Sequence, residues 1–405
     1  MKKTLFVLTS EFPFGVGETF LENEVPILEK HFENLIFVTQ NATGSSRIKN
    51  EKIQCIELGK INFLNRIQVF FSKLFYLEIF DLIKKNKFSI STFRTSLYSL
   101  SRGFSIANKL VELNQKNLKN GYESIFYSYW LDEKAIAIAL LKSKNKKLKA
   151  VSRCHGWDIY EERQKSNYLP YRNFLFKELD KIFPISESGK KYILKNYNVL
   201  NSKIIVSRLG TRKLENSSKK QKTSEFHILS ISSLIPLKRV ELIIASLSLI
   251  DNINIHWTHI GSGPLESEIL KLANEKFERK KNITYSFNGH LSNQNVRLFL
   301  ESNQIDLFMN LSETEGIPVS IMEAQSAKIP VLATNVGGTS EIVNNENGIL
   351  VSKKYNPNDI AHVLTNYIKE IETIKTIKRN KSFSNWENNY NAEMNFEAFI
   401  SLINE

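Results

Sequence analysis

NLSETEGIPVSIMEAQSAKIPVLATNVGGTSE, residues Asn310 to Glu341, is the stretch that decides the fold. An apolar segment over Ile305–Met309 runs into it and predicts a β-strand, after which the chain turns polar. The apolar spacing then predicts a helix over about Val319–Lys328 and a second strand over Ile329–Thr334. A strand, loop, helix and strand in this order are typical of an α/β domain with parallel strands.

Two carboxylates lie eight positions apart across the junction between loop and helix. Glu315 falls in the loop and Glu323 about one and a half turns into the helix, so both can face the crevice at the carboxyl end of the strand. The helix start, around Gly316 and Ile317, offers free backbone N–H groups to hydroxyl or phosphate oxygens. Because each carboxylate can accept two hydrogen bonds from a vicinal diol, the pattern indicates a sugar or a ribose ligand.

This run resembles the E-x7-E signature of the retaining glycosyltransferases of family 4, which have the GT-B fold of two Rossmann-like domains facing a central cleft. The resemblance implies that Glu315 lies beside the donor sugar and that Glu323 binds the nucleotide ribose. Many members have Phe-Gly after the first Glu-Gly, whereas Ile317-Pro318 follows Gly316 here. The spacing of two glutamates also arises by chance in long proteins, so the rest of the chain has to support the assignment.

The composition is that of a globular protein with room for two domains. The chain has 405 residues, of which 42% are hydrophobic and 11% aromatic. A net charge of +13 favours an anionic partner, which could be a membrane surface, a nucleic acid or a phosphorylated substrate. The two cysteines, Cys55 and Cys154, are too far apart for a disulfide framework or a paired-cysteine metal site. We therefore expect a cytoplasmic protein, with the inner face of the membrane as a possible location.

The N-terminus predicts a buried strand over Leu5–Leu8 rather than a signal peptide, because polar residues interrupt the apolar run and no cleavage site follows. No apolar window is long enough to predict a transmembrane helix. Gly15 and Gly17 follow the strand and allow close approach of a ligand to the backbone. The family resemblance implies a position near the donor phosphates and the acceptor, and a plain surface turn is the alternative. We expect Glu18 in the first turn of the next helix, where an acidic residue opposes the helix dipole.

A long helical segment, about 61–113, is rich in aromatic and basic residues. Such helices can lie on an anionic membrane, or their aromatic residues can form part of the core. The interleaved residues are Phe70, Phe71, Phe75, Tyr76 and Phe80 with Arg66, Lys73, Lys84, Lys85 and Lys87.

His155 follows a predicted strand in the sequence RCHGWD, at another carboxyl end of the first sheet. Imidazole titrates near neutrality and could donate to a sugar hydroxyl or to the leaving phosphate. A lone histidine is more often structural. The sequence His-Gly-x-Asp nevertheless resembles the histidine-containing donor-site turn of the same family, which favours a functional interpretation.

The second domain begins with a strand whose following turn carries Lys238 and Arg239, two cations at a helix start that could hold a diphosphate. The family usually has Gly-Arg-Leu followed by a lysine, and here Ser233 fills the arginine position, so Arg239 is the candidate replacement. The turn containing Gly261 and Gly263 resembles the family's Gly-x-Gly-Pro turn beside the nucleotide.

We predict four segments along the chain. Residues 1–214 form an acceptor-binding Rossmann-like domain, and 215–225, which contain no apolar residue, form a linker. Residues 226–385 form a nucleotide-sugar-binding Rossmann-like domain, and the helix over 386–405 packs back on the first domain, as the resemblance implies.

The resemblance implies transfer of a hexose from a nucleoside diphosphate sugar with retention, to a glycan or lipid-linked acceptor in surface polysaccharide synthesis. Lys238 and Arg239 would stabilise the departing diphosphate, and His155 would contact the sugar or phosphate. No Asp-x-Asp metal site stands out, so we expect no metal cofactor. The alternatives are a sugar-nucleotide epimerase and a non-catalytic scaffold subunit, which Ser233 supports. Nucleic-acid binding ranks last, because the basic residues are scattered and no binding motif is present.

Overall fold

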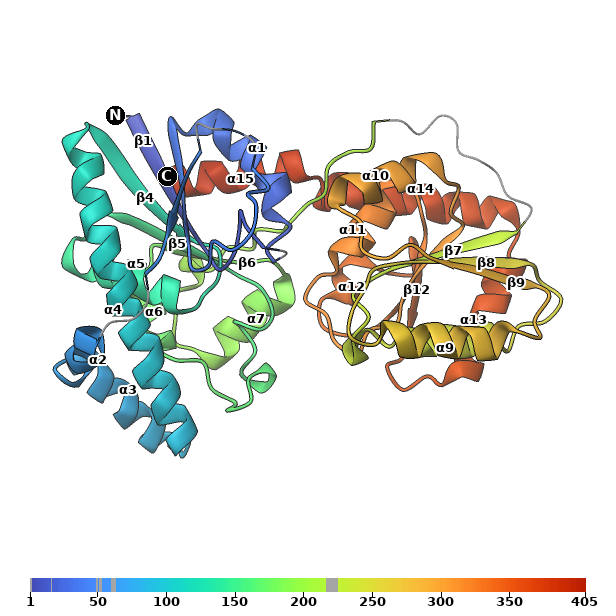
Figure 1. The fold of residues 1–405 in the computed structure, drawn as a ribbon, viewed down its shortest axis with the longest axis horizontal. Helices are drawn as coiled ribbons and strands as arrows, with labels where there is room; N and C mark the ends of the chain where they lie inside the picture. The colour runs from blue at the N-terminus through green and yellow to red at the C-terminus, as the bar shows by residue number, and fades with distance from the viewer. Residues whose placement is uncertain (1, 16, 49, 51–52, 60–62, 216–224) are drawn as a thin grey trace. The chain divides into compact units, whose positions relative to one another are not determined.

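The computed structural model describes residues 2–15, 17–48, 50, 53–59, 63–215 and 225–405 (Figure 1). The chain divides into two compact units. The first comprises Met1–Arg208 together with Phe396–Glu405, and the second comprises Leu209–Asn395. Most of the predicted linker, residues 216–224, lies outside the described residues.

The first unit is built on a sheet of six parallel strands in the order β3-β2-β1-β4-β5-β6. The strands are β1 Lys2–Thr9, β2 Asn34–Thr39, β3 Gln54–Glu57, β4 Tyr122–Ser128, β5 Lys149–Cys154 and β6 Lys181–Pro184. At the centre, Leu5 of β1 pairs with Leu35 on one side and Ile125 on the other. Its neighbours Phe6 and Val7 are buried as well, which explains the uninterrupted apolar run, because helices cover both faces of such a sheet.

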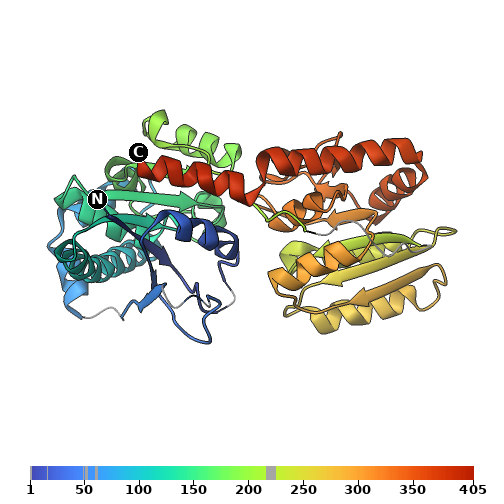
Figure 2. The same cartoon turned by 90° about the horizontal axis from the view of Figure 1, so that it is seen from above.

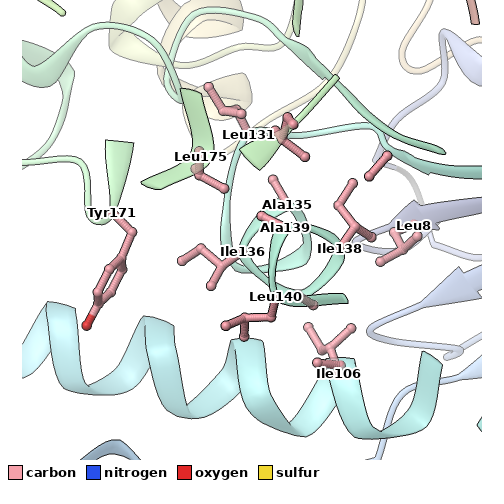
Figure 3. Packing of buried hydrophobic residues seen from close by; sticks show 14 of the residues in the cluster. Leu8, Ile106, Leu131, Ala135, Ile136, Ile138, Ala139, Leu140, Tyr171 and Leu175 are labelled. Atoms are coloured by element: carbon pink, nitrogen blue, oxygen red, sulfur yellow. The ribbon is translucent and has the colours of Figure 1, made fainter. Parts of the chain in front are cut away.

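Helices flank this sheet, and the largest of them form successive layers on one face (Figures 1 and 3). They are α1 Leu21–His31, α2 Phe63–Phe70, α3 Lys73–Lys84, α4 Ile90–Lys119, α5 Glu133–Lys144, α6 Arg172–Glu178 and α7 Glu187–Asn196. α5 packs on β4 and β5, α4 packs on α5, and α2 and α3 pack on α4. Ile136, Ile138 and Leu140 of α5 belong to the same buried core as Leu8 of β1 and Ile106 of α4 (Figure 3).

The last helix, α15 Ala392–Asn404, supplies the final residues of the first unit. Arg153 of β5 is fully buried, and its guanidinium lies 4.4 Å from the ring centroid of Phe399 in α15. The same guanidinium donates to the Tyr127 hydroxyl at 2.8 Å and pairs with Glu24 at 3.4 Å. Burial raises the pKa of Glu24, although the nearby arginine opposes that shift. The C-terminal residues therefore cover a buried charge of the first sheet.

The second unit repeats the plan with the strand order β12-β11-β10-β7-β8-β9, all parallel. Its strands are β7 Phe226–Ile231, β8 Ile255–Ile260, β9 Ile283–Phe287, β10 Leu307–Asn310, β11 Val331–Thr334 and β12 Gly348–Val351. Its helices are α8 Val240–Leu247, α9 Glu266–Phe277, α10 Asn293–Ser302, α11 Val319–Ser326, α12 Thr339–Ile342, α13 Pro357–Lys369 and α14 Glu372–Asn389. Figure 2 shows helices on both faces of this sheet. The core includes Trp257, Leu307 and Met309.

The prediction of two doubly wound α/β domains is confirmed. In the stretch that decided it, the strand, helix and strand are observed as β10, α11 and β11, with ends within two residues of those predicted. Among the described helices, none is both long and apolar enough to cross a lipid bilayer.

Candidate functional site

The centre of the second sheet is the point at which its strand order reverses. β7 and β10 are neighbours there, and the chain proceeds from β7 to β8 and β9 on one side and from β10 to β11 and β12 on the other. Open α/β sheets bind ligands at such a point, outside the carboxyl ends of the strands. Nine predicted site residues belong to this unit, in loops after β7, β8 and β10 or in the helix that follows β10. They are Ser233, Lys238, Arg239, Gly261, Gly263, Glu315, Gly316, Ile317 and Glu323.

Lys238 and Glu315 form an ion pair at the switch point. The Lys238 Nζ atom lies 2.6 Å from Oε1 of Glu315, and Asn310 donates to the same oxygen at 3.4 Å. The Lys238 side chain is 22% exposed and the Glu315 side chain 10% exposed, so both reach solvent. The backbone N–H of Glu313 donates to the Leu237 carbonyl at 2.8 Å and joins the two loops. A cation and a carboxylate are thus held together where a ligand can reach them.

Two glycines after β11 fix the position of the Glu315 backbone. Gly337 has a φ of +53°, and a Cβ built on it would lie 1.9 Å from the Glu315 carbonyl oxygen. The next residue, Gly338, donates its N–H to the Gly316 carbonyl at 2.8 Å. Any side chain at Gly337 would push this loop away from Glu315, so the close approach requires glycine.

The predicted glycines after β8 have a similar role beside the loop that follows β7. Gly261 has a φ of +142°, and its Cβ would lie 1.9 Å from the Ser232 carbonyl oxygen. A Cβ on Gly263 would lie 2.5 Å from the Leu234 carbonyl oxygen. These contacts place the two loops directly against each other, so both glycines have a structural reason to be present, and contact with a nucleotide stays a prediction.

Glu323 lies on α11 and is only partly exposed. Burial raises the pKa of its carboxyl group to about 7. Among the described residues no side-chain or backbone donor is found for the Glu323 carboxylate. The side chain of Ile317, just before the helix, is buried, so only its backbone is available to a ligand.

Arg239 and Ser233 make different hydrogen bonds. Arg239 has a left-handed backbone conformation immediately before α8, and its guanidinium donates to the Lys353 carbonyl at 3.2 Å. Ser233 is exposed, and its carbonyl accepts from the N–H of Ile235 at 3.0 Å. Contact of Arg239 with a diphosphate therefore stays a prediction, and it would require the guanidinium to leave the Lys353 carbonyl.

The other predicted site residues, His155, Gly15 and Gly17, belong to the first unit. His155 is 7% exposed, and its ring contacts the rings of Tyr129 and Trp130, at 4.7 and 4.2 Å between centroids. Among the described residues neither ring nitrogen has a hydrogen-bond partner. Burial, with a smaller contribution from Arg153, holds the pKa of His155 well below its usual value. The expectation that this histidine titrates near neutrality is therefore wrong, and the ring is neutral with one N–H to donate.

The glycine loop after β1 encloses one of the chain's own carboxylates. Gly17 donates its N–H to Oε2 of Glu11 at 3.1 Å, and a Cβ on Gly15 would lie 2.6 Å from the same oxygen. Gly15 has a φ of +59°. Accommodation of the Glu11 side chain accounts for both glycines within the first unit. Contact with donor phosphates stays a prediction.

Glu18 has a role that the sequence argument missed. The prediction that it lies in the first turn of a helix is wrong, because α1 begins at Leu21 and Glu18 precedes it with a φ of +54°. Its carboxylate accepts the backbone N–H groups of Ser10, Glu11 and Phe12 at 2.8 to 2.9 Å. Trp130 also donates to it, at 2.6 Å. The sequence feature that could have indicated this role is a glutamate directly after a Gly-x-Gly loop, because backbone N–H groups in such a loop need a hydrogen-bond acceptor.

The second unit can be placed in a family by comparison with known proteins. Residues 212–382 match the model of the family described as glycosyl transferases group 1. The second unit is a group 1 glycosyl transferase domain. The matched range contains Lys238, Glu315 and Glu323, whereas His155 and the glycine loop after β1 lie outside it.

Several curated proteins are similar to this chain in sequence. The O-antigen biosynthesis glycosyltransferase WbnH of Escherichia coli is 29% identical over 223 residues, which cover 55% of this chain and 61% of that protein. The uncharacterized glycosyltransferase MJ1178 of Methanocaldococcus jannaschii is 25% identical over 324 residues, covering 77% of this chain and 86% of that protein. The putative colanic acid biosynthesis glycosyltransferase WcaL of Salmonella typhimurium is 28% identical over 199 residues, 47% of this chain and 48% of that protein.

Solved structures show the fold of the whole chain. A glycosyltransferase from Rickettsia africae superposes with a TM-score of 0.73 and 15% identity, covering 100% of this chain and 98% of that one. Anabaena Alr3699/HepE in complex with UDP and glucose gives a TM-score of 0.68 at 14% identity over 100% of both chains. The chain therefore has the GT-B fold of two Rossmann-like domains.

Proposed function

We propose that the protein is a retaining hexosyltransferase of family 4 that uses a nucleoside diphosphate hexose as donor. The acceptor is a glycan or a lipid-linked glycan in surface polysaccharide synthesis, and the reaction takes place in the cytoplasm. The names of the relatives, which concern O-antigen and colanic acid, support the pathway class. The complex of HepE with UDP and glucose supports the donor class.

The ion pair between Lys238 and Glu315 at the switch point of the second sheet is the observation on which the proposal rests. Negative charge grows on the diphosphate as the bond to the hexose breaks, and a fixed ammonium there stabilises the transition state. Lys238 is held in place by Glu315, whose carboxylate also accepts from hexose hydroxyls. Lys238 and Arg239 take the role of cations in the proposal, so it includes no metal cofactor.

The ribose site is assigned to Glu323. Its carboxylate is partly exposed and lies on the helix that directly follows the Glu315 loop. Two neighbouring ribose hydroxyls can each donate to one oxygen of such a carboxylate. His155, which is neutral, donates its single N–H to a sugar hydroxyl or a phosphate oxygen. Gly15 and Gly17 are kept as candidates near the donor.

The test is a thermal-shift screen of the full chain with UDP, GDP and ADP and with their hexose derivatives. A nucleotide at a hundred times its Kd stabilises the native protein by about 2.7 kcal/mol, which raises Tm measurably. We expect a shift with one base, lost in Glu323→Gln. Glu313→Gln serves as control, since that carboxylate belongs to the same loop region but pairs with Lys353 at 3.1 Å.

Activity is then measured with the donor that the screen identifies. Lys238→Ala is expected to lower kcat about 10²- to 10³-fold, because it removes a cation aimed at developing charge. Analysis of the products separates transfer from epimerisation of the donor. If no nucleotide shifts Tm, the hexosyltransferase proposal is wrong.

A second candidate function is a non-catalytic GT-B subunit, which Ser233 favours. This residue is exposed and uncharged where the family carries an arginine. Nucleotide binding without transfer or donor hydrolysis in the assay above would support that candidate.

A further inference from the structure

The outer layer of the first unit, formed by α2, α3 and the start of α4, carries a group of exposed apolar side chains. α2 and α3 pack on α4, on the side away from the sheet (Figure 1). Phe71 is 84% exposed and Ile90 is 72% exposed. The other exposed members are Leu64, Ile67, Phe70, Tyr76, Leu77, Phe80, Ile83, Phe88 and Tyr98. We call this set the outer apolar surface.

α3 shows that this exposure is not the ordinary pattern of a surface helix. Its exposed residues Tyr76, Phe80 and Ile83 follow a helical period on the outward face, while Glu78 points inward and is buried. The Glu78 carboxylate accepts from the Tyr168 hydroxyl at 2.6 Å and from the N–H of Tyr171 at 2.7 Å. Phe75 and Leu82 also face inward and are buried, so the helix is apolar on both faces, whereas a helix in contact with water normally has polar residues on its outward face. The outward face of α3 is therefore suited to an apolar neighbour.

Basic residues surround the outer apolar surface. Every residue from Ile83 to Ser91, a segment that spans the end of α3, the turn and the start of α4, is exposed, and this segment contains three lysines. The exposed cations of the layer are Arg66, Lys73, Lys84, Lys85, Lys87 and Arg94. Over residues 63–98 the only carboxylates are the buried Glu78 and Asp81, which pairs with Lys85 at 2.7 Å, and from outside this range Glu161 pairs with Lys87. The surface thus combines aromatic and aliphatic side chains with a strong positive charge.

We propose that the outer apolar surface docks on an anionic lipid bilayer, with its apolar side chains in the interfacial region and its cations on the headgroups. Amphipathic helices with Phe, Leu and Ile on one side and Lys or Arg beside them bind membranes in this way. A second copy of this chain is a poorer partner, because a two-fold contact would bring the same cations face to face. The cations around the outer apolar surface favour an anionic partner, because complementary charges attract across an interface.

The neighbouring pocket links this surface to an acceptor. A cavity of about 520 Å³ is lined by Ser91 and Thr95 of α4, which directly follow the exposed residues Ile90 and Arg94 of the outer layer in the sequence. Trp157 and Arg163 are also in its wall, as is Tyr168, which Glu78 connects to α3. A lipid-linked glycan anchored in the bilayer would meet this polar pocket beside the membrane. This last step rests on the proposed function, whereas docking itself does not.

The test is co-flotation of the full chain with vesicles, one set of phosphatidylcholine and one of phosphatidylcholine with phosphatidylglycerol in equal amounts. We expect binding to the anionic vesicles, weakened by salt. The double variant Phe71→Ser with Phe80→Ser removes two exposed rings without touching the core, and should reduce the bound fraction at least tenfold. Ile377→Ser with Leu298→Ser, two exposed apolar residues of the second unit, is the matched control and should bind as the parent does.

Charge is tested separately with Lys84→Glu and Lys85→Glu, compared with Lys271→Glu and Lys276→Glu on α9. The first pair should abolish the preference for anionic vesicles and the second pair should leave it unchanged. Absence of binding to either vesicle, or equal losses in test and control variants, would overturn the proposal. A dimer seen by light scattering and dispersed by the double serine variant would also overturn it. No nucleotide is present, so failure of docking is distinguishable from failure of the proposed function.

Discussion

The two sheets of this protein share one topology but use their charged residues differently. Numbered from the first strand of each unit, both have the order 3-2-1-4-5-6 and a switch point between strands one and four. In the first unit, Glu18 satisfies the backbone N–H groups after β1 and accepts from Trp130. In the second unit, Lys238 and Glu315 occupy the equivalent place and remain partly exposed.

The same contrast extends beyond the switch points. The first unit contains the fully buried pair of Arg153 and Glu24. In the second unit the carboxylate of Glu323 has spare acceptor capacity and a pKa raised by burial. A buried charge whose partners belong to the same unit stabilises the fold. A charged side chain that reaches solvent is available to a ligand. The fold alone does not decide which of these a unit carries.

The largest effect on stability is expected for the buried ion pair of the first unit. Arg153→Met leaves Glu24 buried without its cation and should cost about 3–5 kcal/mol of unfolding free energy, because a lone buried charge is far less stable than a pair. Urea denaturation measures the loss. Adding Glu24→Gln to Arg153→Met should recover much of it. A loss below about 1 kcal/mol for Arg153→Met would show that this charge pair is not a structural element.

A smaller effect should separate two glycines of the second unit that both have positive φ. Gly337→Ala is expected to cost about 3 kcal/mol, since it combines backbone strain with a clash against the Glu315 carbonyl. Gly289→Ala, whose φ is +61° but whose Cβ meets nothing within 4 Å, should cost about 1 kcal/mol. Thermal denaturation of both variants checks the difference. Equal costs would mean that the contact between the loops is not tight.

The smallest effect concerns pH and Glu323. Its pKa rises from 4.5 to about 7 on folding, so the native state binds more protons between these values. The stability that this group contributes is fully present below about pH 4.5 and is lost as pH rises through about 7. Ribose hydroxyls donate best to the ionised carboxylate, so nucleotide affinity should rise about tenfold from pH 6 to 8.

Titration calorimetry at several pH values measures this dependence. Glu323→Gln should abolish the dependence of nucleotide affinity on pH, and Glu313→Gln should retain it. A parent protein whose nucleotide affinity does not change with pH would contradict the assignment of Glu323 to the ribose.

The sequence predicted the strands because central parallel strands are apolar without interruption, as Leu5–Leu8 shows. It predicted Lys238 and Glu315 as site residues but not their ion pair, because 77 positions separate them and only the strand order brings them together. It placed Glu18 wrongly, since a side chain that bonds to the backbone competes with helix formation. The outward face of α3 was also left undecided, because a helix that is apolar nearly all round does not reveal which face is buried.

The division of the chain has a consequence for synthesis. The first unit needs Phe396–Glu405, and the ribosome makes these residues only after the whole of the second unit. Until they arrive, the guanidinium of Arg153 lacks the ring of Phe399 that lies over it in the finished protein. Domains usually fold in order from the N-terminus as they are made. Here the second unit, which is continuous in sequence, can complete its fold first, and the first unit is completed only when Phe396–Glu405 have followed it.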